Sequence, residues 1–372
     1  MLRLLLDEND LMSHLGALKH YMLLSQGDWL VHFMDIAHTE LARPVKEIQL
    51  SKLESLLDMA TRSSSSCEAS DARDNLTCEL LPMTALEEVL HVISIDGTAA
   101  DRDPAAAKPK PKLTGLEAFS IGYNVKWPLS IVLSNKTLTK YRWLFRHLFT
   151  YRQVEQMLCR AWSCHQATKG VNVQAAFMVS YGLRRRMLHF VQSLQHYLVF
   201  DVIERNWCDF KTNLDSSRVT NLDQLMSVHD HFLDTCIKQF MLNDIELIKA
   251  LARLMHSCIR FADYVDSVAR SFQIGSSVSV RDESDRAFSA KERRMRQQSR
   301  AKVVTENAQI AAMDEHYKRT VRKREREFDT ELKNLLQALS SYSMGGGDPH
   351  MSCLYNNLDF NNFYQSGASA DR

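Results

Sequence analysis

The sequence has few of the residues that break or cross-link a backbone. Its 372 residues include 7 Pro and 12 Gly, too few for a collagen-like or linker-like chain and for the frequent turns of an all-β sandwich. The 8 Cys form no CxxC pair, and three of them, Cys159, Cys236 and Cys258, sit in apolar helical patterns. We therefore expect reduced cysteines that pack as small hydrophobic side chains.

The sequence also lacks a long apolar run and a net charge. No run approaches the roughly 18 apolar residues of a membrane span, and acidic residues directly follow the short apolar start. We therefore expect a soluble, intracellular protein without a signal peptide. With 46 Lys+Arg against 45 Asp+Glu, the net charge of +1 gives no global attraction for nucleic acid or an anionic membrane. We expect neither as a partner.

What the sequence does contain is helical periodicity. Apolar residues recur at spacings of three and four along most of the chain, which is the pattern of a helix with one buried face. Capping-box patterns at Ser51 and Thr84 begin two of these stretches. The expected helices cover residues 10–24, 28–43, a segment from Ser51, a segment from Thr84, 135–158, 173–206, a segment from Thr220, 243–265 and 302–341.

One segment has the period of a β-strand. Phe119, Ile121 and Tyr123 alternate with small or polar residues, and a second short apolar run occupies residues 129–133. The predicted fold class is therefore mainly α, with elongated helical bundles and a small β element near 119–133. The predicted parts are a helical bundle at 1–95, a linker or surface loop at 96–113, a long-helix bundle at 114–272, a charged disordered insertion at 273–301, a C-terminal helix with a docking tail at 302–364 and a disordered tail at 365–372.

The sequence contains none of the common catalytic motifs. It has no GxxxxGK[ST] or GxGxxG phosphate-binding loop, no HExxH and no GxSxG, so we expect no catalytic residue and no cofactor. His229, Asp230 and His231 with Cys236 are a conceivable metal cluster, but residues two apart point to different sides of a helix. A solvated helix face is the preferred interpretation, and no metal is predicted.

Two basic stretches are candidate contact surfaces. Arg184, Arg185 and Arg186 are consecutive in a predicted helix, so at about 100° per residue they fan across about 200°. We expect a solvated face with one ion-paired member. Residues 318–326 mix cations with acidic neighbours, which is typical of an exposed helix laced with ion pairs.

Several blocks, in order along the chain, resemble one family. Residues 26–35 contain a Gly-Asp-aromatic stretch similar to that of gamma-tubulin complex proteins, and residues 115–130 are a more specific match. Further matching blocks are Leu138–Tyr141, Leu144–Phe149, Arg186–Gln192, Phe232–Cys236 and Leu358–Tyr364. From about Asp7 to Tyr364 the chain resembles the C-terminal half of such proteins, which implies α-helical bundles with a small β element.

The resemblance also implies a function. It implies a non-catalytic scaffold that binds gamma-tubulin and positions it to template microtubule nucleation, with guanine nucleotide belonging to gamma-tubulin. Component 3 and other family members are the implied lateral partners, mostly through the family's N-terminal half. The implied location is the cytoplasm and cytoskeleton, at centrosomes, other microtubule-organising centres and spindle poles. A helical-rod scaffold or tethering protein with a non-tubulin partner is the alternative.

The contact residues are predicted from charge. Tubulin-family surfaces are acidic, and arginine makes strong paired contacts with carboxylates, so we look for exposed cations on and beside the matching blocks. Apolar residues of the same blocks, such as Phe119, Phe145 and Met187, are expected in the core. The predicted gamma-tubulin-binding residues are Lys136, Lys140, Arg142, Arg146, Arg184 and Arg185, with Phe360 and Phe363 of the aromatic tail as a second set.

Overall fold

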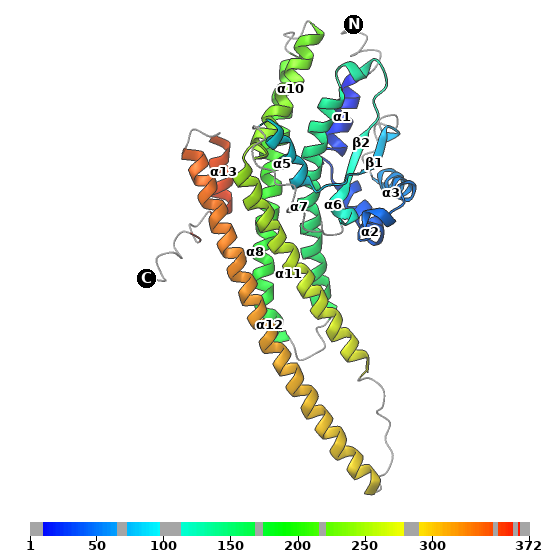
Figure 1. Cartoon of the computed structure of the whole chain (residues 1–372), viewed down its shortest axis with the longest axis vertical. Helices are drawn as coiled ribbons and strands as arrows, with labels where there is room; N and C mark the ends of the chain where they lie inside the picture. The colour runs from blue at the N-terminus through cyan, green and yellow to red at the C-terminus, as the bar shows by residue number, and fades with distance from the viewer. Residues whose placement is uncertain are drawn as a thin grey trace. The chain divides into compact units, whose positions relative to one another are not determined.

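A computed structural model describes residues 10–64, 73–96, 113–167, 174–215, 221–278, 290–344, 349–359 and 364. These residues are mainly helical, as predicted, with one two-stranded sheet among them (Figure 1). The chain divides into two compact units. The first unit comprises Met1–Gln153, Ser193–Ala252 and Ala338–Phe360, and the second comprises Val154–Gln192, Arg253–Gln337 and Asn361–Arg372. Four long helices contribute residues to both units: α7 (Asn135–Ala167), α8 (Gln174–His196), α11 (Ile245–Val278) and α12 (Ala290–Met344).

The first unit begins with three short helices, as predicted. These are α1 (Leu11–Tyr21), α2 (Asp28–Leu41) and α3 (Leu50–Ser63), and α2 packs against α3. Each buries an apolar face, because its large apolar side chains recur at helical spacing. The predicted capping box at Ser51 is wrong. Helix α3 begins one residue earlier, at Leu50, and its N-cap residue makes no side-chain cap.

The small sheet joins two strands that are distant in sequence. Strand β2 (Phe119–Tyr123) is the predicted strand, and it pairs antiparallel with β1 (Leu76–Leu80), which the periodicity did not indicate. All five residues of β2 are buried, including the small Ser120 and Gly122, so β2 is covered on both faces. The expected β character of residues 129–133 is wrong, because a single 3-10 turn, η3 (Leu129–Ile131), lies there instead.

An aromatic cluster forms the core around β2. The ring centroid of Phe119 lies 5.1 Å from that of Phe33 in α2, and 6.2 Å and 5.2 Å from those of Phe145 and Phe149 in α7. All four side chains are buried, which confirms the predicted core positions Phe119 and Phe145. Beside this core, α6 (Gly115–Ala118) approaches α2 so closely that a Cβ on Gly115 would lie 2.9 Å from a main-chain oxygen of α2. Only glycine fits there.

The remaining helices of the first unit follow the predicted periodicity. Helix α5 (Ala85–Asp96) has the predicted box, in which Thr84 and Glu87 cap each other's backbone. The hydroxyl of Ser134 caps helix α7 by accepting a hydrogen bond from the main-chain N–H of Thr137. Helix α8 continues through a π-helical segment, η4 (Tyr197–Glu204), into α9 (Arg205–Asp215). The first unit also contains α10 (Leu222–Gln239) and α13 (Pro349–Leu358).

The second unit contains the C-terminal part of α7 and most of α8, α11 and α12. Ring contacts join α8 to α12 through Phe190 and Phe328, and α11 to α12 through Tyr264 and Tyr317, with centroids 6.4 Å and 5.7 Å apart. Helix covers the described residues 273–278 and 290–301, in the segment where the sequence predicts a disordered insertion. Residues 290–301 lack apolar periodicity, but they are rich in Ala, Lys, Glu, Arg and Gln, which favour a helix.

Candidate partner-binding surfaces

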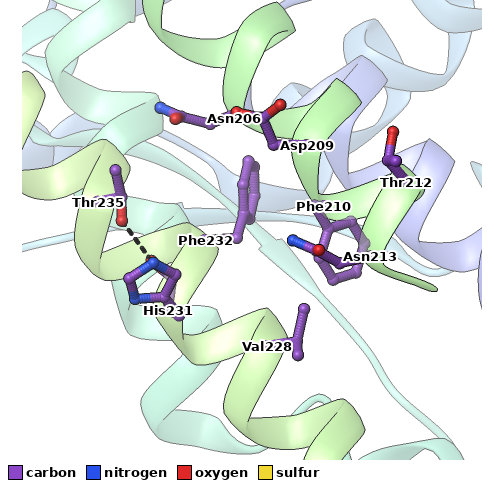
Figure 2. A pocket seen from close by; sticks show the side chains of 9 residues that line it. All are labelled: Asn206, Asp209, Phe210, Thr212, Asn213, Val228, His231, Phe232 and Thr235. Atoms are coloured by element: carbon purple, nitrogen blue, oxygen red, sulfur yellow. Dashed lines mark hydrogen bonds between the residues drawn. The ribbon is translucent and has the colours of Figure 1, made fainter. Parts of the chain in front are cut away.

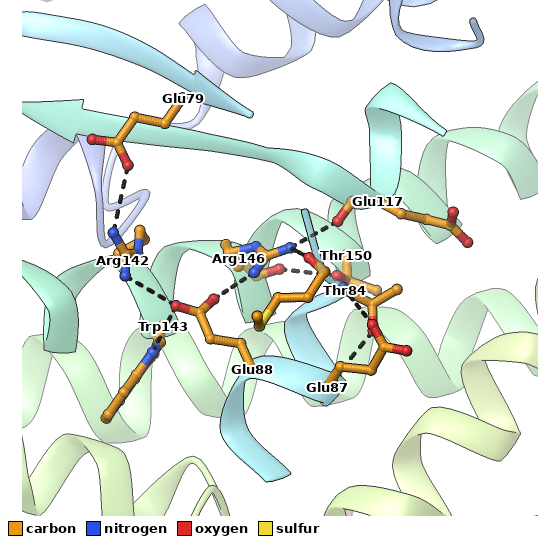
Figure 3. Close-up of polar contacts among 10 residues, drawn as sticks. Glu79, Thr84, Glu87, Glu88, Glu117, Arg142, Trp143, Arg146 and Thr150 are labelled. Carbon is orange, nitrogen blue, oxygen red and sulfur yellow. Dashed lines mark hydrogen bonds and ion pairs between the residues drawn. The ribbon is translucent and has the colours of Figure 1, made fainter. Parts of the chain in front are cut away.

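Two of the predicted contact residues belong to a buried polar network (Figure 3). Arg146 is only 2% exposed. Its guanidinium pairs with Glu88 of α5 and donates to the carbonyl oxygens of Met83 and Glu117, at 2.6 Å and 2.8 Å. Glu88 also accepts from Arg142 at 3.0 Å. The expected exposure of Arg146 is therefore wrong, because its donors are used to join α5, α6 and α7.

A third predicted contact residue, Lys140, is also buried. Its ammonium group forms ion pairs with Asp230 and Asp234 of α10, at 3.2 Å and 2.6 Å. Burial lowers the pKa of Lys140, but the hydrogen bonds that its ammonium group donates to the two carboxylates outweigh this effect and raise the pKa above its usual value. The expectation of a free, exposed cation is wrong here, since Lys140 holds α7 against α10.

The arginine triplet of α8 divides into three environments, as its fan of directions predicts. Arg186 is ion-paired with Glu325 and Asp329 of α12. The guanidinium of Arg184 lies 4.8 Å from the ring centroid of Trp162, and burial lowers the pKa of Arg184. Arg185 is exposed. The predicted single ion-paired member is confirmed as Arg186, and Arg185 keeps a solvated side chain.

The other predicted contact residues differ in their exposure and in their partners. Lys136 is exposed in the first turn of α7. Arg142 is partly buried between Glu88 and Glu79, which lies 3.5 Å away. Phe360 and Phe363 lie outside the described residues. The structure brings Arg142 and Arg146 together around one carboxylate, that of Glu88.

The second basic stretch lies on α12 and differs from the expected pattern. Its acidic residues do not pair with the cations of the same helix. Glu325 and Asp329 bind Arg186 of α8, while Glu327 and Glu331 bind Arg260 and Arg253 of α11. Sequence spacing favoured pairs within the helix, because the arginines of α8 and α11 become neighbours only through the fold. The cations of α12 are thereby left without these acidic partners.

A buried tyrosine–histidine pair replaces the solvated face expected around His229. The Tyr141 hydroxyl lies 2.9 Å from Nε2 of His229, which is 1% exposed. Burial raises the pKa of Tyr141, so the hydroxyl keeps its proton and forms a neutral hydrogen bond with the imidazole. Cys236 is buried as well, whereas His231 is exposed. Within the described residues, no group of three or more His, Cys, Asp or Glu side chains could hold a metal ion.

The buried His229 should make stability depend on pH. Burial lowers its pKa to about 4, with Asp230 opposing the shift and Lys140 adding to it. Between pH 6.5 and pH 4 the unfolded chain binds the proton and the folded chain does not, so stability falls as pH falls. Going from about pH 7 to about pH 5, we expect His229 alone to remove about 2 kcal/mol of unfolding free energy.

Urea denaturation at both pH values measures this loss. The variant His229→Gln should lose about 2 kcal/mol less than the parent chain over this range, because glutamine does not titrate. His231→Gln is the matched control, since His231 lies on the same helix but is exposed. Parallel pH profiles for the parent chain and His229→Gln would contradict the buried, neutral imidazole.

A cleft between α9 and α10 was not indicated by the sequence (Figure 2). It has a volume of about 460 Å³. Phe210 and Phe232, whose ring centroids are 5.5 Å apart, lie among its lining residues and are buried. The polar lining residues are Asn206, Asp209, Thr212, Asn213, His231 and Thr235. An apolar base with a hydrogen-bonding rim suits a small polar ligand or a peptide side chain.

The burial of the cysteines agrees in part with expectation. Cys236 and Cys258 are buried thiols, and burial raises the pKa of each to about 12. Cys159 is exposed, so its expected burial is wrong.

Among the helices that the structure describes, none combines the length and apolar character needed to cross a bilayer.

Comparison with known proteins shows the family. The sequence model described as "Gamma tubulin complex component C-terminal" matches residues 11–364. The chain is 35% identical over 378 residues to gamma-tubulin complex component 2 of Mus musculus, covering 98% of this chain and 41% of that protein. It is 40% identical over 286 residues to gamma-tubulin complex component 2 of Arabidopsis thaliana, covering 76% of this chain and 40% of that protein.

A fungal relative extends the comparison. Spindle pole body component alp4 of Schizosaccharomyces pombe is 30% identical over 316 residues, covering 74% of this chain and 40% of that protein. The chain thus spans about two fifths of the length of these three relatives. Since the family match runs over nearly all of the described residues, the chain belongs to the gamma-tubulin complex component family and corresponds to its C-terminal part.

Proposed function

We propose that this chain is a non-catalytic scaffold of the gamma-tubulin complex that binds gamma-tubulin and positions it to template microtubule nucleation. The observation that carries the proposal is the family match over residues 11–364. Relatives named for the gamma-tubulin complex and for the spindle pole body support a location at microtubule-organising centres. Other members of the family, component 3 among them, are the proposed lateral partners.

The proposed mechanism is positional. Holding several gamma-tubulin molecules at fixed spacing raises their effective concentration and removes much of the entropic cost of forming a nucleus. That task needs a subunit that does not bend where its partner is bound. In the first unit, the bonds of Arg146 and Lys140 tie α7 to α5, α6 and α10. In the second unit, Arg186 ties α8 to α12.

Two cations remain as proposed gamma-tubulin contacts. Lys136 and Arg185 are exposed and have no ion pair or hydrogen bond among the described residues, so both are free to meet carboxylates of a partner. Lys140, Arg142 and Arg146 are withdrawn as contact residues, because acidic partners satisfy their charges inside the first unit. Arg184 is withdrawn because its guanidinium lies over the ring of Trp162. Phe360 and Phe363 remain proposals from the sequence.

Binding of purified gamma-tubulin to the full 372-residue chain tests this function. We expect saturable one-to-one binding that weakens as salt is raised, because screening reduces attraction between exposed charges. The variant Lys136→Gln/Arg185→Gln should bind roughly 2- to 30-fold more weakly, at about 0.2–1 kcal/mol per exposed pair. The control Lys46→Gln/Lys211→Gln removes the same charge from other exposed positions and should bind like the parent.

Three outcomes would argue against parts of the proposal. Failure of a well-folded, helical sample to bind gamma-tubulin would reject this chain as a self-sufficient gamma-tubulin-binding unit and favour a helical tether with another partner. Binding that is insensitive to salt would keep the partner and move the contact to apolar residues. Equal weakening in the test and control variants would show that net charge matters and that Lys136 and Arg185 do not.

A further inference from the structure

Helix α12 presents an unusual segregation of charge within the second unit. All four acidic residues between residues 316 and 341 form ion pairs with arginines of other helices. Five cations of the same stretch are exposed and have no partner among the described residues. We call these cations the α12 stripe: Arg319, Arg322, Lys323, Arg326 and Lys333.

Helix geometry places the stripe on one face. At about 100° per residue, its five cations fall within an arc about 100° wide. The acidic residues lie on the two flanks of this arc. Glu325 and Asp329 are on one flank and face α8, and Glu327 and Glu331 are on the other and face α11. Between Arg319 and Lys333 the packing of α12 therefore satisfies the acidic residues and leaves a positive face, which the exposed Glu315 borders one turn before Arg319.

The stripe has the dimensions of a short docking site. From Arg319 to Lys333 it spans about 21 Å, at about 1.5 Å per residue. An extended polypeptide advances about 3.3 Å per residue, so six or seven residues would cover this length. Three other positions exposed on this face are polar and uncharged, so they can form hydrogen bonds without reducing its positive charge. They are Thr330, Asn334 and Gln337.

The chemistry of the face selects the class of partner. The aromatic residues Tyr317 and Phe328 are buried in the second unit, so the stripe has no exposed ring on which a nucleic-acid base could stack. No exposed large apolar side chain lies between residues 316 and 341 to enter a membrane. What remains is charge without apolar or aromatic contacts, which suits a flexible chain of carboxylates.

We propose that the α12 stripe is a docking surface for an acidic, extended polypeptide segment of a partner protein. The carboxylates of the segment pair with the stripe and relieve the mutual repulsion of its cations. This contact is separate from gamma-tubulin binding through Lys136 and Arg185. It stands on the geometry of α12 alone and does not rest on the proposed function.

The test measures binding of a fluorescein-labelled peptide of about eight residues, half of them glutamate, to the full chain by fluorescence anisotropy. We expect saturable binding that weakens with added salt. Replacing four cations, as Arg319→Gln, Arg322→Gln, Lys323→Gln and Arg326→Gln together, should weaken binding at least tenfold, because several modest exposed pairs are lost at once. Glutamine keeps the helix propensity and leaves the ion pairs with α8 and α11 untouched.

A matched control separates the stripe from net charge. The variant Lys46→Gln, Lys126→Gln, Lys211→Gln and Lys238→Gln removes the same number of charges from exposed positions spread over the first unit. It should bind the peptide within about threefold of the parent, because a specific docking surface depends on the cations of the stripe and not on the net charge of the chain. Equal losses in the two variants would overturn a specific stripe.

Competing partners supply the remaining arms of the experiment. A single-stranded oligonucleotide of equal charge, or vesicles containing an anionic phospholipid, should bind more weakly than the peptide. Tighter binding of either would overturn the polypeptide as the occupant. Absence of binding to all three probes by a folded sample would overturn the docking surface itself. None of these measurements contains gamma-tubulin, so failure here and failure of the proposed function are distinguishable.

Discussion

Replacing Arg146 with methionine is expected to lower the free energy of unfolding by about 3–5 kcal/mol, the cost of leaving a buried charge without its partner. Glu88 would remain buried at 8% exposure, with Arg142 and the Trp143 indole as its remaining partners. Two carbonyl oxygens, from residues 83 and 117, would lose their donor as well. Urea denaturation followed by circular dichroism measures the change.

Two further variants define the cause of this loss. Adding Glu88→Leu to Arg146→Met removes the buried carboxylate that has lost one of its two arginine partners, so the double variant should be more stable than Arg146→Met alone. Arg185→Met is the control, because Arg185 is exposed on α8, and its substitution should change stability by no more than about 0.5 kcal/mol. Similar losses for Arg146→Met and Arg185→Met would rule out a buried, partner-dependent charge at residue 146.

Truncating Phe119 to alanine should destabilise the chain by a comparable amount, about 3–5 kcal/mol. The ring of Phe119 is 1% exposed and contacts the rings of Phe33, Phe145 and Phe149. Its removal leaves a cavity among side chains that belong to α2 and α7. Since the backbone of β2 is paired with β1, the strand cannot shift freely to fill this space.

The matched control is another phenylalanine. Phe200 lies on the π-helical segment η4 and is 58% exposed, so Phe200→Ala should cost less than about 1 kcal/mol. Thermal unfolding of both variants provides the comparison. An equal decrease in midpoint temperature would mean that the cluster around Phe119 does not contribute more than an exposed ring.

The sequence predicted the elements whose signals are local. The periodicity of α1, α2 and α7 and the box at Thr84 depend on neighbours within a few residues, and these predictions are confirmed. Strand β1 (Leu76–Leu80) escaped prediction although it is as long as β2, because its apolar positions, Leu76, Cys78 and Leu80, carry no aromatic or β-branched side chain. Its strand character comes from pairing with β2, which lies about forty residues further along the chain.

The candidate contact residues show the same limit more sharply. From the sequence alone, a cation in a helical pattern looks the same whether the fold exposes it to solvent or pairs it with a carboxylate from a distant segment. Lys140 and Arg146 lie on α7 within about three turns of the exposed Lys136, yet Asp234 and Glu88 bind them only after folding. The opposite holds on α12, where nearby acidic residues suggested neutralised cations. The acidic residues bind other helices instead, which leaves the α12 stripe free.

The bonds around Arg146 also determine where this chain can change its length. Arg146 binds Glu88, which precedes residues 97–112, and the carbonyl of Glu117, which follows them. Main-chain hydrogen bonds join residues 113–115 to the end of α2 as well. Both ends are thus anchored independently of what connects them, and each doubling of the connection costs only about 0.6 kcal/mol. Evolutionary insertions, or an engineered reporter domain, should therefore be tolerated at residues 97–112 with little effect on the fold.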